Sequence, residues 1–194
     1  MKARSFSKRK KQKHPSNTGP IILAVAVLLV AVALAYLLLQ PSVSPGVDRG
    51  AEAPYFSLPV ITSDGLLTQG VDIFSLRGKV VVLEFMVSSC EVCQRMAPAV
   101  ESLYQEYRGM GVTFLSVAGT FGGASAESTA QFIREYGASW THVFDQDNSV
   151  FQKYGIEGTP TYFVIDRTGI ILSRFEGMTP TAAFKAAIDI ALSG

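Results

Sequence analysis

The fold of this chain is decided by the stretch VVVLEFMVSSCEVC at residues 80–93. Its first part is short, almost wholly apolar and rich in valine, which is typical of a strand buried on both faces of a sheet. Apolar residues then recur every three or four positions from residue 92 to residue 108, and this spacing predicts a helix. The stretch therefore places two cysteines at the junction of a buried strand and a helix.

Cys90 and Cys93 are the only cysteines of the chain, and at this spacing they can close a small disulfide ring at the start of a helix. The helix N-terminus would stabilise the thiolate of Cys90, which is the reactive form of the sulfur. Two other interpretations are open, an inert structural disulfide and half of a zinc site. A closed zinc site needs four ligands, and the chain adds only His14, beyond a hydrophobic span, and His142. The context favours redox chemistry without a metal.

The N-terminal region has an uneven distribution of charge. Seven of the seventeen basic residues lie in the first thirteen positions, and no acidic residue lies among them. Residues 21–39 contain no charge, and as a helix they would cover about 28 Å, close to the thickness of a bilayer core. A cleaved signal peptide has a shorter apolar region and a small-x-small cleavage site, for which residues 40–45 are a poor match. We therefore expect an uncleaved anchor, with the basic tail in the cytoplasm.

Four parts follow from this pattern. Residues 1–19 are expected to form a basic cytoplasmic tail, residues 20–39 a transmembrane anchor, residues 40–52 a linker rich in proline, serine and glycine, and residues 53–194 a single extracytoplasmic domain. The protein is thus predicted to be a single-pass protein of the cell membrane. Binding of nucleic acid by the basic tail is not expected, because the charges stop where the apolar span begins.

The domain is predicted to alternate strands and helices. The expected strands are residues 80–85, 112–117, 162–165 and 170–175, and the expected helices are residues 92–108, 128–136, 150–154 as a short turn, and 181–192 with Thr179 as N-cap. This order predicts an α/β sandwich with a central mixed sheet.

Residues 51–177 resemble the TlpA/ResA-like membrane-anchored thiol–disulfide oxidoreductases, a group with the thioredoxin fold that overlaps the AhpC/TSA-like sequences. The matching stretches are, in order, APYFSLP at 53–59, SLRGKVVVLEF at 75–85, the cysteine pair with Pro98 five residues later, and GIEGTPT at 155–161. The resemblance implies a thioredoxin-like sandwich, with a central mixed β-sheet flanked by helices, preceded by one transmembrane helix.

Four positions depart from the pattern of this group. Met86 and Ser89 stand where tryptophan is common, Val92 stands where proline is usual before the second cysteine, and Met96 replaces a glutamate of some members. These changes bear on the choice of partner and on the redox potential, and they leave the chemistry of the two sulfurs intact.

The position of each cysteine predicts its role. Cys90 precedes the helix, so it should be the more exposed sulfur and should exchange disulfides through a mixed disulfide that Cys93 resolves. Glu84 lies inside an apolar strand, where an unpaired charge is costly, unless it faces outward at the strand end. The resemblance instead implies a buried acid that moves protons for Cys93, with a raised pKa. It also makes Pro160 a cis-proline facing the cysteine pair, with the Thr159 backbone presented to a peptide substrate.

The expected function is reduction of disulfides in protein substrates, with electrons from a membrane donor and with no cofactor or metal. Glu91 adds a negative charge beside Cys90 and Val92 supplies no hydrogen bond, so the disulfide should be comparatively hard to reduce. The resemblance does not decide between three cellular processes in which such domains act: cytochrome c maturation, copper-site assembly and general thiol repair.

Two alternative functions belong to related proteins. A peroxiredoxin-type peroxidase carries P-x-x-x-T-x-x-C around its reactive cysteine, and this chain has Leu83 and Val87 at the proline and threonine positions. A thioredoxin-like copper chaperone uses a cysteine pair with a distant histidine, for which His142 is the candidate.

Overall fold

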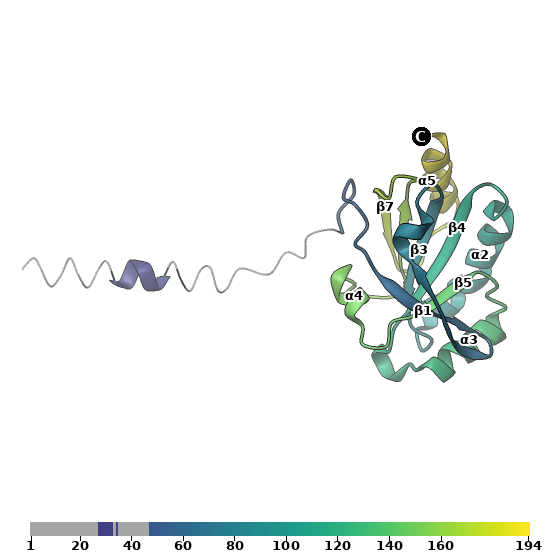
Figure 1. The fold of residues 1–194 in the computed structure, drawn as a ribbon, viewed down its shortest axis with the longest axis horizontal. Helices are drawn as coiled ribbons and strands as arrows, with labels where there is room; N and C mark the ends of the chain where they lie inside the picture. Colours follow the sequence, from purple (N-terminus) through teal and green to yellow (C-terminus); the bar gives the residue numbers. More distant parts are fainter. Residues whose placement is uncertain (1–26, 33, 35–46) are drawn as a thin grey trace, which may run out of the picture. The chain divides into compact units, whose positions relative to one another are not determined.

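A mixed sheet of seven strands forms the centre of the domain in the computed structural model, which describes residues 27–32, 34 and 47–194 (Figure 1). The strands are β1 (Ser57–Thr62), β2 (Gly65–Asp72), β3 (Val80–Met86), β4 (Val112–Ala118), β5 (Thr141–Phe144), β6 (Thr161–Ile165) and β7 (Ile171–Glu176). Their order in the sheet is β2-β1-β5-β4-β3-β6-β7. The pairs β3–β4 and β4–β5 are parallel and the other pairs are antiparallel, so the predicted mixed sheet is confirmed.

Helices cover both faces of this sheet. They are α2 (Glu91–Tyr107), α3 (Ala126–Tyr136), α4 (Ser149–Lys153) and α5 (Thr181–Ser193), with the 3-10 turns η1 (Ile73–Leu76) and η2 (Phe121–Gly123). The buried side chains of α2, α3 and α5 share one apolar cluster, and those of α4 and η1 belong to the cluster on the opposite face. The predicted α/β sandwich is thus the observed architecture.

The central strand β3 is buried along its whole length. Val80, Val82 and Met86 point into the cluster beneath α2, whereas Leu83 and Phe85 point into the cluster beneath α4. Because successive side chains of a strand point to opposite faces, a strand covered on both sides needs apolar residues at nearly every position. This explains the continuous apolar run, and it places Glu84 on the face that α2 covers.

The predicted elements are found within about two residues of their expected ends, and three strands were not predicted. β2 is largely exposed, and β1 contains Pro59 and only one fully buried residue, so neither shows the buried run of a typical central strand. β5 has only four residues. The predicted N-cap of α5 is wrong, because Pro180 takes that position and the Thr179 hydroxyl donates to the Gly177 carbonyl.

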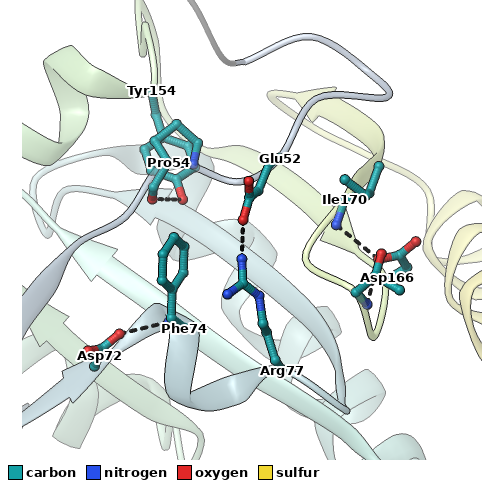
Figure 2. Close-up of polar contacts among 9 residues, drawn as sticks. Glu52, Pro54, Asp72, Phe74, Arg77, Tyr154, Asp166 and Ile170 are labelled. Atoms are coloured by element: carbon teal, nitrogen blue, oxygen red, sulfur yellow. Dashed lines mark hydrogen bonds and ion pairs between the residues drawn. The ribbon is translucent and has the colours of Figure 1, made fainter.

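The segment before β1 packs onto the domain. Figure 2 shows Glu52 paired with Arg77 and the Tyr154 hydroxyl donating to the Pro54 carbonyl, at 2.8 Å. Val47 is buried, and Glu52 forms a β-bridge with Ile170. The structured domain therefore includes residues 47–52, which the sequence prediction placed in the linker.

The predicted tail at residues 1–19, most of the predicted anchor at residues 20–39 and the linker residues 40–46 lie outside the described residues. Of the anchor, residues 27–32 and 34 are described and are helical. No helix within the described part of the chain has both the length and the apolar character needed to cross a membrane. The chain divides into two units, residues 1–43 and 44–194, and the domain is described here by itself.

Candidate redox-active site

The two cysteines lie where β3 passes into α2. Cys90 is the N-cap residue of α2, and its sulfur accepts a hydrogen bond from the backbone N–H of Cys93 at 3.1 Å. The two residues form a disulfide, with their Cα atoms 5.2 Å apart. The Cys90 sulfur thus occupies the place of a capping oxygen, where a thiolate gains from free N–H groups and from the positive end of the helix. The predicted ring at the helix start is confirmed.

The two sulfurs differ in access to solvent. Cys93 is 1 % exposed and packs in the cluster beneath α2, whereas Cys90 is only partly buried. The loop before Cys90 is tied to its surroundings, because Gln94 donates to the Ser88 carbonyl at 2.9 Å and the Ser88 and Ser128 hydroxyls lie 2.7 Å apart. A partner sulfur can therefore approach Cys90 more easily than Cys93.

The loop before β6 brings a second segment to Cys90. The Thr159–Pro160 peptide bond is cis, as the resemblance implies, and the Thr159 carbonyl oxygen lies 3.3 Å from the Cys90 sulfur. Pro160 is buried and Thr159 is partly exposed. The structure thus brings together Cys90, Thr159 and Pro160, which lie about 70 residues apart in the chain.

A surface hollow beside Cys90 was not predicted from the sequence. It is lined mainly by Val87, Phe121, Phe151, Ile156 and Thr159. Phe121 is 49 % exposed there. A large aromatic side chain between glycines, in the stretch GTFGG at residues 119–123, is the signal that points to it. An apolar surface next to a reactive sulfur suits the side chains that flank a substrate cysteine.

Glu84 is buried on the same face of the sheet as Cys93. Its side chain is 5 % exposed, so the alternative of an outward-facing residue at a strand end is wrong. The Ser116 hydroxyl donates to Glu84 Oε2, and the Trp140 indole N–H donates to Ser116 Oγ at 2.6 Å. Burial raises the pKa of Glu84, and the hydrogen bond from Ser116 opposes that rise. Trp140 is buried, and its hydrogen bond to Ser116 was not predicted from the sequence.

His142 lies in β5 and is 1 % exposed. Its Nδ1 atom lies 2.9 Å from the Trp140 carbonyl oxygen, and burial lowers its pKa to about 4. No three side chains of the metal-ligating kinds gather into one group within the described residues, so His142 does not join the two cysteines there. The geometry therefore does not assemble the third copper ligand that the chaperone alternative requires.

A disulfide at the start of a helix and beside a cis-proline loop, in a domain built on a mixed sheet, defines the class of thioredoxin-like thiol–disulfide oxidoreductases. Residues 48–189 match the family model described as Redoxin, and the chain belongs to that family. Within it, this protein is a ResA/TlpA-like thiol–disulfide oxidoreductase.

Known proteins of this kind are similar over most of the chain. Thiol-disulfide oxidoreductase ResA of Bacillus subtilis (strain 168) is 27 % identical over 169 residues, 87 % of this chain and 88 % of that one. ResA of Geobacillus thermodenitrificans (strain NG80-2) is 30 % identical over 151 residues, 77 % and 82 % of the two chains. A solved structure from Chlorobium tepidum, provisionally named thiol:disulfide interchange protein DsbE, has a TM-score of 0.67 and 30 % identity, and covers 76 % of this chain and 99 % of its own.

We expect Glu84 and His142 to give the stability of the oxidised protein opposite pH dependences. The folded pKa of His142 is about 4 against an ordinary 6.5, so its contribution is present above pH 6.5 and is lost as the pH falls towards 4. That loss is on the order of 3 kcal/mol. The folded pKa of Glu84 is raised above 4.5, so its contribution is present below that pH and is lost as the pH rises through the folded pKa.

Urea unfolding of the purified protein between pH 4 and pH 8 measures both effects. His142→Asn keeps a donor for the Trp140 carbonyl and does not titrate. It should therefore remove the fall in the free energy of unfolding between pH 6.5 and pH 4. Glu84→Gln should remove the decline in the free energy of unfolding as the pH rises. If the free energy of unfolding of both variants depended on pH as that of the unmodified protein does, the assignment would be wrong.

Proposed function

We propose that this protein is a membrane-anchored, extracytoplasmic oxidoreductase that reduces disulfides in other proteins. The observation that supports reduction of proteins best is the unequal pair of sulfurs, with Cys90 reachable at the helix start and Cys93 buried behind it. The exposed apolar surface around Phe121 beside Cys90 suits a polypeptide substrate. The uncharged run at residues 21–39, after a basic tail, supports the anchor and the orientation.

The reaction proceeds through a mixed disulfide. In the reduced protein the Cys90 thiolate attacks one sulfur of a substrate disulfide, forming a Cys90–substrate bond and releasing the other substrate sulfur as a thiolate. Glu84 in its ionised form takes the proton from the Cys93 thiol, and the Cys93 thiolate attacks the Cys90 sulfur. The second substrate thiolate leaves, and Cys90 and Cys93 remain joined in a disulfide. A membrane donor then returns the protein to the dithiol form with two electrons.

The direction of electron flow follows from the surroundings of Cys90. A strong oxidant has a reactive thiolate that is heavily stabilised. Here Glu91 lies in the first turn of α2, and Arg95 pairs with it only at 3.9 Å, with both side chains exposed to solvent. Such an exposed pair contributes little. The helix terminus is then the main stabilising influence on the thiolate, which favours a reductant.

The two cysteines should be unequal in function. Cys90→Ser should abolish insulin reduction. Cys93→Ser should accumulate mixed disulfides through Cys90, because no second thiol is left in the protein to displace the substrate from Cys90. Non-reducing gels and mass spectrometry of cells that produce Cys93→Ser would detect the species and identify the partners, and thereby separate cytochrome c maturation from copper-site assembly and thiol repair. A Cys93→Ser variant without trapped partners, with Cys90 the slower thiol to alkylate, would reverse the roles.

The reduction potential should lie below about −200 mV, nearer to thioredoxin than to strong oxidants such as DsbA. Equilibration with glutathione at defined ratios, followed by alkylation of free thiols, gives the value. Glu91→Gln should raise it slightly, because the Cys90 thiolate loses a neighbouring negative charge. A potential above about −160 mV would identify an oxidant instead.

Protease added to intact spheroplasts should degrade the domain and leave the basic tail protected. The tail should become accessible only after the membrane is permeabilised. A domain that survives in intact spheroplasts while the tail is cut would overturn the proposed topology.

A further inference from the structure

Four buried polar residues form a row across the sheet. In the strand register Glu84 pairs with Ser116 on one side and with Tyr162 on the other, and Ser116 pairs with His142. Register partners point to the same face of a sheet. All four side chains are at most 5 % exposed. Polar groups in such a core are costly without partners, so the hydrogen bonds within the row decide what each group can do.

The hydrogen bonds that reach Glu84 have a fixed direction. An indole N–H can only donate, and that of Trp140 donates to Ser116 Oγ at 2.6 Å. The Ser116 oxygen is thereby used as an acceptor, and its own hydrogen is directed to Glu84 Oε2. Against the ionised carboxylate the Ser116 hydroxyl can only donate, so Glu84 Oε2 is engaged as an acceptor, and Oε1 is the oxygen that Ser116 leaves open to a proton.

We propose that Ser116, oriented by Trp140, is a positioning residue for proton transfer by Glu84, and that Glu84 Oε1 is the oxygen that takes the proton of Cys93. The inference rests on the proposed role of Glu84 in disulfide exchange. A hydroxyl that donates to a carboxylate stabilises the ionised form. Ser116 therefore keeps a fully buried acid able to act as a base.

The other groups that face Glu84 do not replace it. From β6, the Tyr162 hydroxyl lacks a hydrogen bond of good geometry among the described residues, and burial together with the Glu84 charge raises its pKa, so it stays neutral. From β5, His142 is kept neutral because burial lowers its pKa to about 4. From α5, Phe184 contributes a ring that packs against Tyr162. From α2, Cys93 is the thiol whose proton Glu84 takes in this proposal, and the charged residues Glu91 and Arg95 are exposed.

The test is the pH profile of single-turnover insulin reduction by the pre-reduced protein between pH 5 and pH 9. Ser116→Ala removes the donor to Glu84, so the midpoint of the profile should move about one pH unit to the alkaline side. The rate below the midpoint should fall about tenfold. Ser116→Thr keeps a hydroxyl and should retain the original midpoint. Trp140→Phe keeps Ser116 but frees its hydroxyl, so it should shift the midpoint less and in the same direction.

A matched control separates this effect from a general loss of packing. Thr129 in α3 is fully buried and its hydroxyl has no hydrogen-bond partner within the described residues. Thr129→Val therefore removes a buried hydroxyl that belongs to a helix and not to this row, and it should leave the midpoint unchanged. The infrared carbonyl band of protonated Glu84, assigned by its loss in Glu84→Gln, gives a second readout that does not depend on activity. Its pH midpoint should move in Ser116→Ala as the rate profile does.

The outcomes distinguish two failures. If Glu84→Gln leaves the pH profile of insulin reduction unchanged, the proposed proton transfer by Glu84 is wrong, and the role of Ser116 falls with it. If Glu84→Gln removes the midpoint while Ser116→Ala and Trp140→Phe leave it in place, Glu84 acts as proposed and Ser116 is merely structural. If Ser116→Ala does not fold, an unshifted infrared midpoint in Trp140→Phe overturns the inference.

Discussion

The burial of β3 on both faces is the constraint on which the rest of the structure depends. Neither face of this strand meets water, so each side chain from Val80 to Met86 has to be apolar or supplied with partners inside the protein. Glu84 is the one acid in the strand, and a serine on β4 supplies its hydrogen bond instead of solvent. The same strand leads into the turn that ends at Cys90, so the core and the reactive sulfur are positioned together.

One turn of helix makes two identical side chains chemically different. Cys90 caps the N-terminus of the helix, where its sulfur accepts an N–H and is partly exposed. Cys93 lies three residues later and faces the core. The structure thus gives the two sulfurs different access to a partner, and in the proposed mechanism the buried one is the sulfur that needs a base. That need gives a physical reason for an acid inside an apolar strand.

The elements around the site could be predicted because their local patterns are strong. The apolar run of β3 and the helical spacing of α2 are found almost where the sequence placed them. β1, β2 and β5 escaped prediction because β2 is exposed, β1 contains Pro59 and β5 has four residues. The hydrogen bond from Ser116 also escaped, since it depends on the parallel register of β3 and β4, whose paired residues lie 32 positions apart. The sequence of either segment read alone does not show how the two strands align.

The sequence by itself determined which chemistry to expect of this protein: two sulfurs at the start of a helix and an acid inside an apolar strand. These properties are local, because they follow from the spacing of residues within one strand and one helix. Only the tertiary structure decided that Thr159 reaches Cys90, that Ser116 and Trp140 hold Glu84, and that His142 is not grouped with the cysteines. Those contacts join residues from different strands, and strand order and register in the sheet decide which of them meet.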